Sequence, residues 1–175
     1  DNAYYRKNIR RMSYISGKII TTAIKPDEKS QYDMYYNFSE EVKKIPSHRV
    51  LAITRAEKEG VIKVKFEVDE EMIFKFLESK IILSDNIYSE ILRNTIIDAY
   101  RRLIKPSIER EIRSEKFSEA SSKAIGVFGI NAKNLLMQPP IENSVIMGFD
   151  PAYRTGCKIA IIDETGKLLD YTTVY

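Results

Sequence analysis

The C-terminal segment from Val145 to Tyr175 constrains the fold of this chain more than any other stretch. An apolar run ends in Asp150, a polar turn follows, and a second apolar run extends from Lys158 to Ile162. Asp163 and the turn Glu164-Thr165-Gly166 then lead into a third extended stretch. Short apolar runs separated by polar turns predict neighbouring β-strands. We therefore expect the first strands of a sheet, with an acidic residue at the tip of the first strand.

A strand that ends in an exposed aspartate at the start of a sheet points to an RNase H-like α/β domain. The third predicted strand is the last element before Tyr175. We therefore expect only the opening part of such a domain in this sequence. The N-terminal residues Asp1 to Arg6 include no initiator methionine, which is compatible with a fragment.

The residues before this segment have mainly helical patterns. Gln138-Pro139-Pro140 ends them, because a proline forces the residue before it out of the helical region. We place a domain boundary there, with a mainly helical region at 1–140 and the start of the RNase H-like domain at 141–175. The predicted class is α+β.

The helical region is expected to consist of separate short elements. Apolar spacing, capping residues and prolines predict helices over 4–16, from Ser39, over 46–59, after Asp69, from Asn86 to Leu103 and after Ser107. Lys18 to Ile24 is expected to be extended or a strand, and the alternation over 62–68 predicts a strand with one solvated face. The apolar stripe from Tyr88 to Leu103 is expected to be buried, and breaks are expected at Pro106 and near Phe117-Ser118.

Composition limits the function classes. Hydrophobic residues make up 43% of the chain, which favours a packed core over disorder, and the net charge of +3 is far from that of a dedicated nucleic-acid arm. Basic residues between 101 and 113 alternate with acids, which favours surface ion pairs. The single cysteine, Cys157, excludes an internal disulfide and fits a cytoplasmic setting. No segment is long and apolar enough to suggest a membrane span.

Asp150 is the main candidate for chemistry. Carboxylates fixed at strand tips can hold Mg²⁺, and nucleases of this architecture clamp two metal ions with several carboxylates. Asp163 is expected to serve the hairpin turn instead. Asp150 is therefore interpreted as a turn or capping residue, a vestigial metal position, or a live metal ligand. With one aspartate of this kind, we expect no catalytic residue and no bound metal.

The loop after Asp150 offers a second candidate site. Arg154, Thr155 and Lys158 supply a guanidinium group, a hydroxyl and an ammonium group that can hold phosphate, so they are candidate nucleic-acid contacts. The alternative is that Arg154 pairs with Asp150 or a nearby acid. No Walker loop and no G-x-G-x-x-G motif is present, so no nucleotide cofactor is expected.

Several segments together resemble the bacterial transcription accessory protein family Tex. The matching stretches are IPSHRVLAITRAEKEG (45–60), DAYRRLIKPSIEREIRSE (98–115), KNLLMQPP (133–140) and GFDPAYRTGCKIAIIDETGKLLD (148–170). The resemblance implies a helical region leading into a YqgF-type, RNase H-like domain that lacks a full nuclease site. It also implies nucleic-acid binding, mainly through downstream helix-hairpin-helix and S1 domains. Where the family typically has glycine after Asp150-Pro151, this chain has Ala152.

The resemblance implies a scaffold within a Tex-like protein, which positions nucleic-acid-binding modules and works with the transcription machinery. Two alternatives stay open. One is a metal-dependent RNase H-like nuclease or resolvase that uses Asp150. The other is a helical interaction module that contacts the transcription machinery through the Asn86–Leu103 helix.

Overall fold

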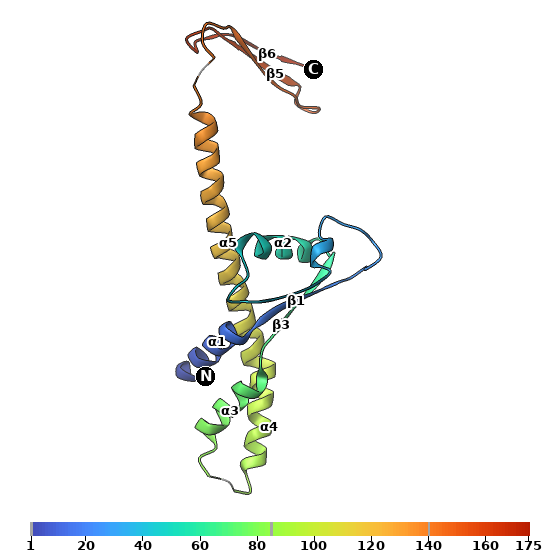
Figure 1. The fold of residues 1–175 in the computed structure, drawn as a ribbon, viewed down its shortest axis with the longest axis vertical. Coiled ribbons are helices and arrows are strands. Elements are labelled where there is room, and N and C mark those ends of the chain that lie inside the picture. The colour runs from blue at the N-terminus through green and yellow to red at the C-terminus, as the bar shows by residue number, and fades with distance from the viewer. Residues whose placement is uncertain (1, 85, 140) are drawn as a thin grey trace. The chain divides into compact units, whose positions relative to one another are not determined.

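The computed structural model describes residues 2–84, 86–139 and 141–175 (Figure 1). Contacts divide the chain into two compact units, unit 1 (Asp1–Gly129) and unit 2 (Ile130–Tyr175). This division falls inside a helix. The boundary expected at residue 140 depends on two prolines, of which Pro140 lies outside the described residues, and it stays a prediction.

Unit 1 combines helices with a small antiparallel sheet of strand order β2-β1-β3. Its strands are β1 (Lys18–Ala23), β2 (Asn37–Glu41) and β3 (Ile62–Glu67). Its helical elements are α1 (Ala3–Ser16), the 3₁₀ turn η1 (Asp33–Tyr35), α2 (Ser47–Lys58), α3 (Glu70–Ile81), α4 (Ser89–Ala99), the π-helical turn η2 (Tyr100–Ile104) and most of α5 (Lys105–Leu136).

The ends of α1 follow from local chemistry. The side chain of Asn2 accepts a hydrogen bond from the backbone N–H of Tyr4 at 2.9 Å, which caps the first turn. Gly17 ends the helix, as the sequence predicts, and its backbone N–H donates to the carbonyl of Ser13 at 2.9 Å. A Cβ atom at this position would collide with that carbonyl and would lie 2.8 Å from the ring of Phe66. Only glycine therefore fits where α1 turns into β1.

The helix expected to begin at Ser39 is wrong, because this segment forms β2. Residues of β2 pair antiparallel with β1, so that Ser39 lies opposite Ile20 and Phe38 lies opposite Thr21. Phe38 packs against the hydrophobic core from this position. A hydroxyl followed by two acids is a weak local capping signal, and strand pairing with a core-packed aromatic side chain overrides it.

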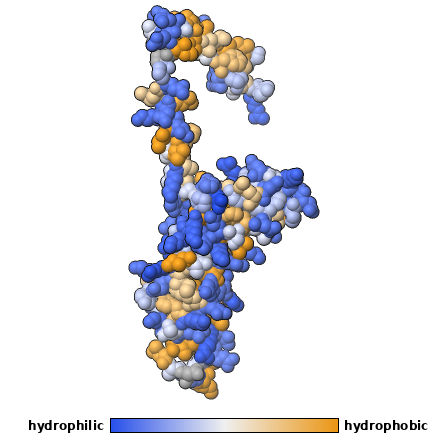
Figure 2. Space-filling model, viewed as in Figure 1, coloured by the Kyte–Doolittle hydropathy of each residue, from blue (hydrophilic) through white to orange (hydrophobic). Residues whose placement is uncertain are grey.

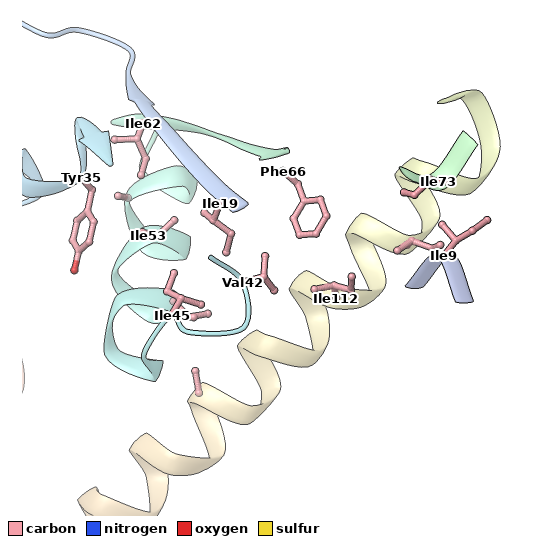
Figure 3. Packing of buried hydrophobic residues seen from close by; sticks show 14 of the residues in the cluster. Ile9, Ile19, Tyr35, Val42, Ile45, Ile53, Ile62, Phe66, Ile73 and Ile112 are labelled. Atoms are coloured by element: carbon pink, nitrogen blue, oxygen red, sulfur yellow. The ribbon is translucent and has the colours of Figure 1, made fainter. Parts of the chain in front are cut away.

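The core of unit 1 fills the space between the sheet, α2 and α5 and continues to α1 and α3, which contribute Ile9 and Ile73 (Figure 3). Figure 3 shows Ile19 of β1, Phe66 of β3 and Ile112 of α5 directed towards the same interior. The aromatic residues of 32–38 contribute to this core, since Tyr32 and Tyr35 are each 6% exposed. Burial of such side chains supplies most of the stabilising free energy of a small domain. The same packing fixes the orientation of the sheet relative to α2 and α5.

The helical segment from α4 to α5 is continuous, so the breaks expected at Pro106 and near Phe117-Ser118 are wrong. Proline lacks an N–H and its ring clashes with the carbonyl four residues earlier in a regular α-helix. The chain avoids this clash with η2, in which the backbone N–H of Lys105 donates to the carbonyl of Tyr100. A π-helical turn widens the helix and lets it continue through Pro106. Within the described ranges, no helix has both the length and the apolar character needed to cross a bilayer.

Unit 2 contains the predicted C-terminal strands. These are β4 (Ile146–Asp150), β5 (Cys157–Ile162) and β6 (Leu168–Val174), which form an antiparallel sheet of order β4-β5-β6. The expected α+β class is therefore confirmed. Asp150 is the last residue of β4, as the sequence predicts.

Candidate functional site

Asp150 lies at the edge of the unit 2 sheet, with its side chain exposed to solvent. In the strand register Asp150 lies opposite Lys158 of β5, which in turn lies opposite Thr173 of β6. Directly opposite residues on neighbouring strands present their side chains on the same face. Asp150 and Lys158 therefore share one face, and both line an open hollow of about 560 Å³ that also includes Tyr171.

The residues present do not fit a two-metal centre. Among the described residues, no three His, Cys, Asp or Glu side chains lie close enough together to hold a metal ion. A two-metal hydrolytic site needs several clustered carboxylates. Asp150 has a lysine as its cross-strand neighbour, and the next aspartate along the chain, Asp163, is used in a turn.

Asp163 organises the hairpin between β5 and β6, as the sequence predicts. Its Oδ1 atom accepts hydrogen bonds from the backbone N–H of Thr165 at 2.9 Å, the hydroxyl of Thr165 at 2.7 Å and the backbone N–H of Lys167 at 3.0 Å. The hydroxyl bond from Thr165 and the backbone bond from Lys167 hold the pKa of Asp163 below its ordinary value. Gly166 completes the turn with a φ of 83°. This carboxylate therefore has a structural role.

The loop after Asp150 presents Arg154 and Thr155 to solvent. No hydrogen bond or ion pair joins the Arg154 side chain to any residue that the structure describes, so the alternative pairing of Arg154 with Asp150 is not formed. Ala152 has a negative φ, and in this loop only Gly156 has a positive φ, of 77°. The loop therefore accommodates alanine at 152 without strain. Arg154 and Thr155 lie outside the hollow that Asp150 and Lys158 line, and their role as phosphate contacts stays a prediction.

Four of the basic residues between 101 and 113 form ion pairs, which confirms the interpretation of this charge pattern, while Arg110 donates to the backbone carbonyl of Pro106 at 3.1 Å. Arg101 and Lys105 both contact Glu70 of α3, at 2.9 and 2.6 Å. Arg102 contacts Asp98 at 2.8 Å within the helix. Further pairs join α5 to α1 and α2, namely Arg6 with Glu111, Arg10 with Glu111 and Glu115, and Arg113 with Glu57. Helix α5 is thus fastened to three other helices of unit 1.

The structure has an exposed apolar surface at the start of α4 that the sequence pattern did not predict. Ile96 and Tyr100 are buried as predicted, but Tyr88 is 65% exposed and Ile91 is 62% exposed. Figure 2 shows hydrophobic residues among hydrophilic ones on the surface around α3 and α4. A groove of about 230 Å³ opens beside it, lined mainly by apolar side chains of α1, α3 and α4, including Tyr5, Leu77 and Leu92. The helical stripe predicted a buried face, whereas only part of that stripe has neighbours to pack against.

Two family descriptions match this chain. Residues 1–128 match the family described as Tex central region-like, and residues 144–175 match the family described as Tex protein YqgF-like domain. The first match covers unit 1 almost entirely, and the second contains all three strands of unit 2.

The relatives that the chain resembles are much longer proteins. The protein YdcI of Bacillus subtilis is 45% identical over 179 residues, covering 100% of this chain and 25% of YdcI. The transcriptional accessory protein Tex of Neisseria gonorrhoeae is 35% identical, covering 86% of this chain and 21% of that protein. The human S1 RNA-binding domain-containing protein 1 is 30% identical, covering 90% and 17%. The chain spans a quarter or less of the length of these relatives. The family matches and these identities show that the chain belongs to the Tex family of transcription accessory proteins.

Proposed function

We propose that this chain is a scaffold in a transcription accessory protein that binds nucleic acid. The observation that carries the proposal is the family match, which covers both units. The relatives include a transcriptional accessory protein and an S1 RNA-binding domain-containing protein, which supports a nucleic acid as the partner. In this proposal the strongest binding comes from other domains of the whole protein.

The geometry of α5 suits a scaffold. Its first turns are fastened by ion pairs to α1, α2 and α3, and Ile108 and Ile112 are buried in the core. A long helix that is rigidly held at one end can set the position of whatever follows it. Most of the basic side chains of α5 form ion pairs with acidic side chains. Few of them are therefore available to contact phosphate groups.

A salt-dependent titration tests the scaffold proposal. The chain is titrated with single- and double-stranded RNA and DNA over a range of salt concentrations. A scaffold is expected to bind weakly, with a small change in affinity as salt rises, because few phosphates are neutralised. Tight binding by this chain with a steep salt dependence would overturn the proposal.

We also propose that this chain does not itself catalyse phosphodiester cleavage. The reason is the lack of clustered carboxylates around Asp150 among the described residues. Incubation of labelled RNA and DNA with Mg²⁺ or Mn²⁺ checks this point. Cleavage that disappears in Asp150→Asn and persists in Asp163→Asn, a matched change at the hairpin turn, would establish the nuclease alternative.

A second candidate function is contact with the transcription machinery through the apolar groove. The observation that favours it is the exposure of Tyr88, Ile91 and Leu92 beside that groove, because contiguous exposed apolar surface marks interaction sites. Pull-down of purified RNA polymerase is expected to weaken with Leu92→Lys, because Leu92 lines the groove and is 37% exposed. Ile24→Lys is the matched control, since Ile24 is a similarly exposed isoleucine, at 44%, that does not line the groove. Equal retention by both variants and the unchanged chain would count against this function.

A further inference from the structure

The unit 1 sheet has one covered face and one open face. Ile19 and Thr21 of β1 point to the core and are buried, whereas Lys18 and Thr22 on the opposite face are exposed. The same alternation in β3 buries Ile62 and Phe66 on one face and exposes lysines on the other. Because side chains alternate along a strand, the open face carries every second residue of all three strands.

Lysines collect on this open face. Lys63 lies opposite Thr22 and Lys65 lies opposite Ile20 in the register of β1 and β3. Lys18 lies on the same face at the other end of β1. We call Lys18, Lys63 and Lys65 the lysine face.

Unlike the basic residues that join α5 to its neighbours, Lys63 and Lys65 form no ion pair with any residue that the structure describes. Lys18 lies opposite Glu41 and Glu67, and the pKa of Glu41 is held below its ordinary value by Lys44 and, to a smaller degree, by Lys18. Two acids share the open face, Glu41 and Glu67, and both lie at the Lys18 end. Glu41 is already paired with Lys44 at 2.9 Å. The end of the face that holds Lys63 and Lys65 therefore has an uncompensated positive charge.

We propose that the lysine face binds the phosphate backbone of a single-stranded nucleic acid. Lys63 and Lys65 are two residues apart on one strand, so their side chains emerge about 7 Å apart on the same side. This spacing is comparable with that of neighbouring phosphates along one nucleic-acid strand. Because the two lysines lie in a single row on β3, they contact one backbone at a time, so the second backbone of a duplex gains no contact with this row.

The neighbouring residues of the open face are small and polar except for Ile20, which is half-buried between Ser39 and Lys65. Thr22, Ser39 and Asn37 are exposed and supply hydroxyl and amide groups that can hydrogen-bond to phosphate or sugar oxygens. No aromatic side chain occupies the alternating outward positions of β1, β2 or β3, so base stacking does not contribute here. The contact is therefore expected to be weak and tolerant of sequence.

This inference rests on the proposed function for the class of partner, and it adds a binding surface within unit 1. It requires a weak contact with few phosphates, which a scaffold permits. Absence of any binding would overturn the lysine face and leave the scaffold proposal standing. Tight binding with a steep salt dependence would overturn the scaffold proposal instead.

The test uses fluorescence anisotropy with a labelled single-stranded oligouridylate and a labelled duplex of the same length. The logarithm of the binding constant is expected to fall with the logarithm of the salt concentration with a slope of about −1.4, since Lys63 and Lys65 each contribute about 0.7 for a single strand. The double variant Lys63→Gln/Lys65→Gln is expected to lower the slope by about 1.4 and to weaken binding by roughly tenfold.

The matched control is Lys25→Gln/Lys123→Gln, which removes the same charge from two lysines that already pair with Glu28 and Glu119 at 2.7 Å each. This control is expected to keep the slope of the unchanged chain. Thermal melting of each variant verifies that the exposed substitutions leave the fold intact. An equal loss in the control, tighter binding of the duplex, or no binding by the unchanged chain at the lowest salt would each overturn the proposal.

Discussion

The two units of this chain are stabilised in different ways. Within the described ranges, every residue of the buried hydrophobic core lies between Ile9 and Ala120, in unit 1. In unit 2 the apolar side chains of the sheet are largely open, with Met147 62% exposed and Tyr171 76% exposed. Among the described residues all ion pairs also belong to unit 1. Unit 1 is thus held by side-chain packing and unit 2 by its backbone ladder and turns.

The difference shows which features of each unit are sensitive to mutation. A core side chain in unit 1 touches several elements at once, so its loss weakens helices and sheet together. In unit 2 the strand pairing and the turn residues determine the structure, and many side chains can change at little cost. The following predictions test this comparison, starting with the largest expected effect.

The largest effect is expected from Ile112→Ala on α5. Ile112 is 1% exposed and lies beside the sheet in the core (Figure 3), so the substitution leaves a cavity and lowers the free energy of unfolding by about 2–5 kcal/mol. Ile125→Ala on the same helix is the control, because Ile125 is 70% exposed, and it is expected to change stability by at most about 0.5 kcal/mol. Urea denaturation measures both. Similar losses in the two variants would contradict the assignment of the core to the first part of α5.

The next effect is expected from Gly156→Ala in unit 2. Gly156 has a φ of 77°, and a Cβ atom there would lie 2.8 Å from Cγ2 of Thr173 and 2.9 Å from the carbonyl oxygen of Val174. Left-handed backbone costs an alanine about 1–2 kcal/mol, and the contacts with β6 add to that cost. Hydrogen exchange is expected to accelerate across β5 and β6 and to stay unchanged in unit 1.

Gly166→Ala is the comparison that separates the backbone cost of Gly156→Ala from the cost of its close contacts with β6. Gly166 has a φ of 83°, but a Cβ atom added there would meet no other atom within 4 Å, so only the backbone cost applies. Its effect on exchange is expected to be smaller than that of Gly156→Ala. Equal effects would show that close approach to β6 contributes nothing, and faster exchange in unit 1 in either variant would contradict the expectation that these turns affect unit 2 alone.

Much of the fold follows from sequence where local signals agree with tertiary packing. The alternation of Ile62 to Glu67, the stop at Gly17 and the cap at Asp69 all predict elements that the structure contains. The errors occur where long-range contacts override a local signal. Ser39 looks like a helix cap but pairs with β1, and Pro106 looks like a break but follows a π-helical turn. Neither strand pairing nor a π-turn has a reliable local signature.

The candidate site is less predictable from sequence than the fold. The positions of Asp150 at a strand end and Asp163 in a turn follow from the spacing of apolar runs. The lysine face requires the register of β1 and β3, because alternation places Lys63 and Lys65 on a solvated face without showing what lies beside them. The exposure of Ile91 depends on which helices pack against α4, and a periodic stripe does not contain that information.

A moderate effect on stability is expected from Glu70→Gln, which tests the ion pairs between helices of unit 1. Hydrogen bonding from Lys105 and then from Arg101 holds the pKa of Glu70 below its ordinary value of 4.5. A lowered pKa means that the folded state favours the carboxylate, so this stabilisation is present above pH 4.5 and is lost as the pH falls through the folded pKa. Glu70→Gln is expected to lower the free energy of unfolding by about 1 kcal/mol at neutral pH and by much less in acid or high salt. Denaturation at several pH values measures this, and a pH-independent loss would contradict it.

The smallest effect on stability is expected from substitution of Asp163, because this residue stabilises a hairpin turn and is not part of a core. The pKa of Asp163 lies below its ordinary value of 3.8, so its contribution to the hairpin is present above that pH and is lost as the pH falls through the folded pKa. All three donors reach Oδ1, and the amide oxygen of asparagine can accept the same bonds without a charge. Asp163→Asn is therefore expected to keep the turn and to remove its sensitivity to acid, whereas Asp163→Ala loosens the turn at every pH. Amide exchange of Thr165 and Lys167 distinguishes these outcomes. If salt weakened this turn as strongly as it weakens the Glu70 pairs, charge and not hydrogen-bond geometry would hold it, and the contrast between the two units would be smaller than the structure indicates.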